Sequence, residues 1–130
     1  MKRVLLVDDQ PMVLRLMRLA LEKAGYQVDV AIDGEDALAK IADSCPDIMV
    51  TDIEMPRMSG KELCLHLQDT MPDRKFPIFV STSLTDSQHR EWTNEISNLV
   101  FLEKPISIRK LQSVVSELLG PDDVTIAGHA

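Results

Sequence analysis

The chain has 130 residues, the length of one ordinary domain, and 45% of them are hydrophobic, which is enough to form a buried core. Its net charge of −7 argues against broad, charge-driven binding of nucleic acid. No apolar run approaches the roughly 18 residues of a membrane span, and the run near the start is too short for a signal peptide. We therefore expect one cytoplasmic domain that contacts neither membrane nor nucleic acid directly.

The first third of the chain predicts two strands, each followed by a helix. Residues 4–7 are a continuous apolar run, typical of a strand buried on both faces of a parallel sheet, and residues 26–31 alternate as a second strand. Pro11 suits the first turn of a helix that Gly25 closes, and Asp33 can cap the next helix. The buried sides expected for these helices are Val13, Leu16, Met17, Ala20 and Ala24, then Ala37, Leu38, Ile41 and Ala42.

Residues 46–60 form the stretch around which the chain is organised. An apolar strand, 48–51, ends on Asp52, and a loop separates it from a helix that begins with the capping-box pair Ser59 and Glu62. The buried side expected for this helix is Leu63, Cys64 and Leu67. An acid at the carboxyl end of a buried strand stands where open α/β sheets hold their ligands.

The last third predicts two more strands and two more helices. Residues 77–82 and 99–103 are apolar runs, and the helix between them begins with a second capping pair, Thr85 and Gln88. Its main apolar residues are Trp92 and Ile96. With so few of them, we expect it to be the most weakly held helix. The apolar stripe of the last helix is Ile108, Leu111, Val114, Val115 and Leu118.

Strands that alternate with helices predict a parallel sheet with helices on both faces. Polar residues stand at the carboxyl ends of four of these strands, and they are Asp8, Asp9, Asp52, Thr82 and Lys104. Because the carboxyl ends of parallel strands share one edge of a sheet, we expect these side chains to converge.

The chemistry of this set points to phosphoryl transfer. Carboxylates that are brought together repel one another unless a cation neutralises them or one of them stays protonated. Mg²⁺ prefers such oxygen ligands, and it also neutralises a phosphoryl group that approaches an anionic nucleophile. Lys104 adds a fixed positive charge, and the hydroxyl of Thr82 can donate to a phosphoryl oxygen. The set therefore predicts transfer of a phosphoryl group onto a carboxylate.

At this point the chain resembles a response-regulator receiver domain of bacterial two-component signalling, of the chemotaxis-regulator type. The matching segments are 5–9, 46–47, 52–56, Gly60, 82–83 and 104–105. The resemblance covers residues 1–119 and implies an α/β, doubly wound, flavodoxin-like sheet of five parallel strands in the order 2-1-3-4-5. We expect a receiver domain over 1–120, with 121–130 as a natural tail or a truncated linker. A stand-alone receiver and one cut from a larger regulator or hybrid kinase both remain open.

The resemblance also implies a role for each residue of the site. Asp52 is the expected phosphoacceptor, Asp9 binds Mg²⁺ directly, and Asp8 binds it directly or through water. The carboxylate of Asp52 and the backbone carbonyl of Glu54 complete the protein ligands of the ion. Lys104 pairs with a phosphoryl oxygen and, before phosphorylation, with Asp52.

The same resemblance implies a switch and its partners. Thr82 binds the phosphoryl group and moves inward, and Phe101 stands where the family has its rotating aromatic residue. The face of the fourth helix, fifth strand and fifth helix then changes its affinity for a downstream protein, and a homodimer through this face is also open. The expected donor is a sensor histidine kinase or a phosphotransfer protein. The domain assists its own phosphorylation and dephosphorylation but is not an enzyme that turns over a substrate. The Lys104–Pro105 bond is expected to be cis.

The chain departs from the family pattern at three places, two of which are Arg57 and Ser97–Asn98, and three other functions are considered beside the receiver. Arg57 stands where the family often has glycine, and Ser97–Asn98 where it usually has Gly-Ala. An adaptor that binds partners without phosphorylation is disfavoured because the whole set of site residues is present. A phosphohydrolase with Asp52 as nucleophile would use Glu54 as its acid-base, but that family places the motif on the first strand. A flavin-binding domain would need a phosphate-cradling loop after the first strand, which this chain lacks.

Overall fold

The computed structural model describes residues 2–82, 90–104 and 107–119. The strands are β1 (Arg3–Val7), β2 (Gln27–Ala31), β3 (Ile48–Asp52), β4 (Ile78–Thr82) and β5 (Leu99–Glu103). The helices are α1 (Pro11–Lys23), α2 (Gly34–Asp43), α3 (Gly60–Thr70), α4 (Arg90–Thr93) and α5 (Ile108–Leu119). Within these described ranges, no helix has the length and apolar content that crossing a membrane requires.

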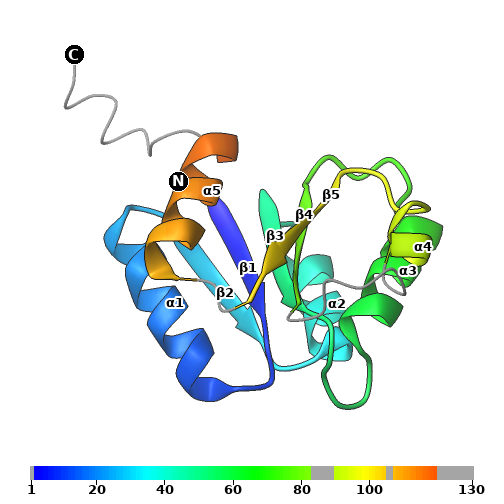
Figure 1. Cartoon of the computed structure of the whole chain (residues 1–130), viewed down its shortest axis with the longest axis horizontal. Coiled ribbons are helices and arrows are strands. Elements are labelled where there is room, and N and C mark those ends of the chain that lie inside the picture. Colours follow the sequence, from blue (N-terminus) through cyan, green and yellow to red (C-terminus); the bar gives the residue numbers. More distant parts are fainter. Residues whose placement is uncertain (1, 83–89, 105–106, 120–130) are drawn as a thin grey trace.

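The strands form one parallel sheet in the order β2-β1-β3-β4-β5, as predicted. Successive side chains of β1 point to opposite faces, so that Leu5 and Val7 enter one core cluster while Val4 and Leu6 enter the other. Helices α1 and α5 cover one face, whereas α2 and α3 cover the other, together with the region of α4 (Figure 1). The chain therefore has the doubly wound, flavodoxin-like fold that was expected from its sequence.

Helix α1 begins at Pro11 and is followed by Gly25, whose φ of 100° lies in the left-handed region that glycine adopts readily. Its buried face differs from the predicted one. Leu14, Met17 and Leu21 are buried, while Leu16 is 58% exposed. Ala24 is also exposed and Ala20 only partly buried. The helix carries two apolar stripes at helical spacing, so the period alone could not show which stripe faces the sheet.

Helices α2 and α3 begin as their capping residues predict. Asp33 accepts a hydrogen bond from the amide of Asp36 at 2.7 Å, and Ser59 and Glu62 form the reciprocal capping box. The buried side chains of α3 are those expected. In α2, by contrast, Ala42 is exposed and Leu38 is only partly buried, so the predicted face was too wide.

The region of α4 and β5 combines a short helix with a strand at the edge of the sheet. Helix α4 spans Arg90–Thr93, so Ile96 is buried beyond its end, and the predicted capping pair at 85 and 88 lies outside the described residues. Strand β5 is an edge strand, with Val100 45% and Phe101 37% exposed.

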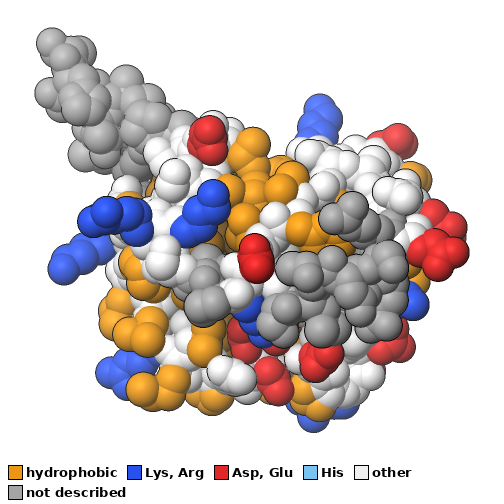
Figure 2. All heavy atoms as spheres, in the orientation of Figure 1, with side chains coloured by type: hydrophobic (Ala, Val, Ile, Leu, Met, Phe, Trp, Pro, Cys, Tyr) orange, Lys and Arg blue, Asp and Glu red, His pale blue; other side chains and the backbone are white. Residues whose placement is uncertain are grey.

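Helix α5 contains the whole predicted apolar stripe, but it buries only part of that stripe. Leu111 and Val115 are fully buried, and Val114 is partly buried. Ile108 and Leu118 are exposed. Apolar side chains therefore gather at the surface between β5 and α5 and along α1 (Figure 2).

Candidate functional site

Three carboxylates meet at the carboxyl edge of the sheet. Strands β1 and β3 are neighbours, with Val7 opposite Thr51, so the acids that follow these two residues are brought together. One oxygen from each of Asp8, Asp9 and Asp52 lies within 4.8 Å of the others. Asp8 and Asp52 are buried and Asp9 is exposed. The predicted convergence is therefore confirmed for these three acids.

Asp52 is held from two sides. Its Oδ1 accepts a hydrogen bond from the amide of Ile53 at 2.8 Å, and the same oxygen lies 2.8 Å from Nζ of Lys104. Among the described residues, none donates a hydrogen bond to Oδ2. One carboxylate oxygen is thus fixed in place, and the other has no protein partner within the described part of the chain.

The negative charge of Asp8 is less well stabilised by its surroundings than that of Asp52. Burial raises the pKa of its carboxyl above the ordinary value, the hydrogen bond from the amide of Gln10 lowers it, and the nearby charge of Asp52 raises it again. Among the described residues, Lys104 is the one cation that forms an ion pair with any of these three acids, and its partner is Asp52. A hard divalent cation fits this oxygen-only donor set because it would offset the repulsion between the carboxylates.

Thr82 is the last residue of β4, and Lys104 directly follows β5, the strand that pairs with β4. Asp52 stands opposite Ser81 in the β3–β4 register, and Thr82 is the next residue and the last of β4. Thr82 is buried, and its carbonyl accepts a hydrogen bond from the amide of Lys104 at 2.9 Å. Ser83, the second residue of this motif, lies outside the described residues.

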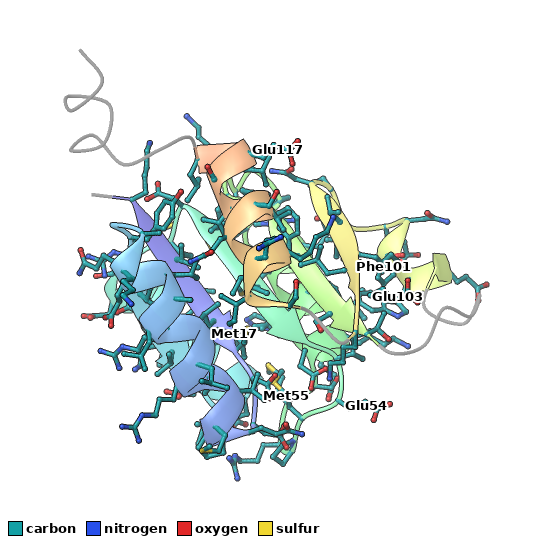
Figure 3. The ribbon with its side chains drawn as sticks, turned by 60° about the vertical axis from the view of Figure 1, so that its left-hand side comes forward. Met17, Glu54, Met55, Phe101, Glu103 and Glu117 are labelled. Carbon is teal, nitrogen blue, oxygen red and sulfur yellow. The ribbon has the colours of Figure 1, made fainter. Side chains whose placement is uncertain are left out.

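Glu54 and Phe101 are the other two predicted site residues. Glu54 is exposed in the loop after β3, with its side chain directed outward (Figure 3). The loop is closed by a hydrogen bond from the amide of Gly60 to the carbonyl of Ile53 at 2.7 Å. A Cβ at Gly60 would lie 2.0 Å from the backbone oxygen of Asp52, so this position needs glycine. Phe101 lies on β5, opposite Val80 in the register.

Sequence reasoning missed a cavity beside the acids. Its volume is about 650 Å³, and it opens between α1 and the start of α5, with Asp52 and Lys104 in its wall. Its apolar wall is formed by Val13, Leu16, Met17 and Ile108. These apolar residues were expected in the core, because a helical stripe does not reveal that one side of it borders a cavity. The predicted cis bond before Pro105 lies outside the described residues.

Comparison with known proteins identifies what this chain is similar to. The model of the response regulator receiver domain matches residues 4–116. The chain is 31% identical to the alkaline phosphatase synthesis transcriptional regulatory protein PhoP of Bacillus subtilis over 123 residues, which are 95% of this chain and 50% of PhoP. The chain therefore spans about half the length of such curated relatives.

Two solved structures share its fold along nearly their whole length. The chemotaxis protein CheY4 of Vibrio cholerae has a TM-score of 0.82 and 28% identity, with 91% of this chain and 98% of that chain covered. The response regulator TrrA of Thermotoga maritima, in complex with Mg²⁺ and BeF, has a TM-score of 0.73 and 30% identity, with 91% and 99% covered.

Proposed function

The chain belongs to the response regulator receiver family, and we propose that Asp52 is its phosphoacceptor. The donor is a phosphohistidine on a sensor histidine kinase or phosphotransfer protein. The observation that carries this proposal is the convergence of Asp8, Asp9 and Asp52 within 4.8 Å, with Lys104 2.8 Å from Asp52. Asp8, Asp9, Asp52 and the backbone carbonyl of Glu54 would hold Mg²⁺, which would neutralise charge on the transferring phosphoryl group when it is bound.

The residues of the chain then have distinct tasks. Oδ2 of Asp52, which has no partner among the described residues, forms the new P–O bond while the P–N bond of the phosphohistidine breaks and the imidazole leaves with the bonding electrons. Lys104 holds Oδ1 and supplies positive charge beside the incoming phosphoryl oxygens. The hydroxyl of Thr82 donates a hydrogen bond to one of these oxygens. The domain thus assists its own phosphorylation and does not act as an enzyme on a separate substrate.

The output of the switch is a change on the face of α4, β5 and α5. Thr82 moves toward the phosphoryl group, and Phe101 follows because it lies on the strand next to β4. The exposed apolar residues Val100, Phe101 and Leu118 support this face as the binding site of a downstream protein or of a second copy of the chain.

The setting of the domain is also part of the proposal. PhoP is named a transcriptional regulatory protein, so the prediction of no direct nucleic-acid contact applies to the residues of this chain alone. We assign the receiver domain to 1–120, treat 121–130 as a tail or linker, and place the domain in the cytoplasm.

Intact-mass spectrometry after incubation with acetyl phosphate tests the proposal. We expect one added phosphoryl group that requires Mg²⁺ and is absent in Asp52→Asn. No adduct, together with no binding of beryllofluoride to a protein that does bind Mg²⁺, would favour the adaptor reading instead. Steady turnover of p-nitrophenyl phosphate would favour a phosphohydrolase.

A further inference from the structure

A polar bracket joins the loop after β3 to the start of α2. Nε of Arg57 lies 2.5 Å from Oδ2 of Asp33, and the amide of Gly34 donates to the carbonyl of Met58 at 2.9 Å. We call these two links the bracket. The carboxylate of Asp33 is almost fully buried, whereas Arg57 is half exposed. The loop is therefore anchored at its tip to a buried group of another element.

The backbone at Arg57 is in a conformation that side chains rarely adopt. Its φ of 63° lies in the left-handed region, where glycine carries no steric penalty and other residues do. A non-glycine residue persists in such a conformation when its surroundings hold it there. In this chain the side chain of Arg57 is paired with Asp33, and the next residue, Met58, accepts a hydrogen bond from Gly34.

The anchor for this loop is itself rigid. Oδ1 of Asp33 accepts a hydrogen bond from the amide of Asp36 at 2.7 Å, so one carboxylate caps α2 and pairs with Arg57 at the same time. A Cβ at Gly34 would come within 2.5 Å of the side chain of Met58. The loop after β3 is therefore packed closely against the first residue of α2. Movement of the loop tip would therefore break contacts with α2.

The end of β2, just before the turn to α2, is hydrogen-bonded to the backbone of one of the acids. The carbonyl of Ala31, two residues before Asp33, accepts a hydrogen bond from the amide of Asp8 at 3.0 Å. At the base of the loop, the amide of Ile53 donates to Asp52. The segment from Ala31, the last residue of β2, to Gly34 thus contacts both segments that carry proposed metal ligands, the end of β1 and the loop that contains Glu54.

We propose that Arg57 is a positioning residue for the metal site. Its ion pair with Asp33 holds the loop 53–59 in place, and with it the backbone carbonyl of Glu54, relative to the carboxylates of Asp8 and Asp9. The inference rests on the proposed function, since it needs a Mg²⁺ site at these acids. Neither member of the pair touches the ion. Without the pair the loop samples other conformations, and the affinity for Mg²⁺ falls because a ligand is no longer held ready.

Two variants remove the ion pair while keeping the local backbone. Arg57→Gly tolerates the positive φ, and Asp33→Asn keeps a good helix cap. Coulomb forces alone predict opposite effects: losing a positive charge would tighten Mg²⁺ binding, and losing a negative one would weaken it. Positioning predicts that both variants bind more weakly. This difference in sign separates the two explanations.

Mg²⁺ titrations followed by amide NMR shifts, with melting curves in parallel, measure the effect. We expect Arg57→Gly to bind Mg²⁺ about threefold to tenfold more weakly, below the effect of a group that bonds a ligand directly. Its melting temperature should stay near that of the parent because the strain at φ 63° is relieved. The double variant should bind no more weakly than the weaker single variant. Arg57→Lys, which keeps the charge, should lie between parent and Arg57→Gly.

Arg18→Ala is the matched control, because it removes one positive charge from a surface ion pair, with Glu22 at 3.2 Å, on α1. Its affinity should equal that of the parent. Binding by Arg57→Gly as tight as or tighter than that of the parent overturns the inference, as does a parent that binds no Mg²⁺. A parent that binds Mg²⁺ but takes no phosphoryl group from acetyl phosphate refutes the proposed function while leaving the bracket supported or refuted by the titrations.

Discussion

Asp8 and Asp33 are two buried carboxylates in the same setting with opposite electrostatics. They follow the neighbouring strands β1 and β2 at one edge of the sheet, and they are 7% and 3% exposed. Hydrogen bonds from the amide of Asp36 and from Arg57 hold the pKa of Asp33 below its ordinary value. Burial, with Asp52 adding to it, raises the pKa of Asp8.

The opposite pKa shifts indicate that Asp33 stabilises the fold, whereas Asp8 is available to bind a ligand. A carboxylate that is fully hydrogen-bonded and paired stabilises the folded state in its charged form. A buried carboxylate next to a second acid destabilises it, and that cost is relieved when a cation binds. The edge of the sheet thus contains one acid that is satisfied by the protein and one that is left for a ligand.

The largest expected effect is the loss of the satisfied acid. Asp33→Ala removes the cap of α2 and leaves Arg57 at a positive φ without its partner, so we expect the melting temperature to fall by roughly 5–10 °C. Asp33→Asn, which keeps the helix cap, should lower the melting temperature clearly less. Equal melting temperatures for Asp33→Ala and the parent would contradict the structural role of this acid.

Removing the charge of Asp8 should raise the melting temperature instead of lowering it. Asp8→Asn keeps an acceptor for the amide of Gln10 and removes a charge that burial disfavours. We expect the metal-free protein to melt about 3–5 °C higher, the shift that roughly 1 kcal/mol produces in a domain of this size. Mg²⁺ should raise the melting temperature of the parent and not that of the variant. An Asp8→Asn variant that melts below the parent in EDTA would contradict the contrast between Asp8 and Asp33.

The pH dependence sharpens the same contrast. Because the pKa of Asp8 is raised in the folded state, the folded protein holds this proton more tightly than the unfolded chain does. The stability that the protonated carboxyl contributes is fully present below pH 3.8 and is lost as the pH rises through the pKa of the folded state. The advantage of Asp8→Asn should therefore grow above pH 3.8 and vanish below it. Because the pKa of Asp33 is lowered, its contribution is present above pH 3.8 and is lost as the pH falls. Denaturant titrations of both asparagine variants from pH 3 to 7 should show these opposite trends, and parallel curves would count against them.

The smallest expected effect concerns the cation beside the acids. Lys104→Met removes the partly exposed ammonium that lies 2.8 Å from Asp52. We expect the melting temperature in EDTA to fall by about 2–4 °C, since an ion pair with one exposed member stabilises only modestly. Saturating Mg²⁺ should restore part of this loss. A variant that Mg²⁺ does not stabilise more than the parent would argue that Lys104 and the ion do not share the task of neutralising these acids.

Much of the fold could be predicted because its signals are local. The apolar runs gave the strands within a residue or two, and the pair Ser59 and Glu62 gave the start of α3. Since all strands are parallel, their carboxyl ends had to share an edge, which brought Asp8 and Asp52 together. The same reasoning placed Lys104 beside Asp52.

What could not be predicted depends on contacts between distant segments. Helix α1 has two apolar stripes, and only packing against the sheet buries Leu14 and exposes Leu16. The pair of Asp33 and Arg57 joins residues 24 apart, through a loop whose left-handed residue is not glycine. The sequence marked Arg57 as a departure from the family, but nothing in the sequence identified its partner.

Carboxyl ¹³C NMR across a pH titration, with and without Mg²⁺, tests the central contrast most directly. We predict that in the metal-free protein the pKa of Asp8 lies above 3.8 and that of Asp33 below it. Mg²⁺ should lower the pKa of Asp8 and leave that of Asp33 unchanged, because the ion replaces a proton at one acid and not at the other. Two carboxyls that titrate alike, or an Asp8 that does not respond to Mg²⁺, would contradict the account.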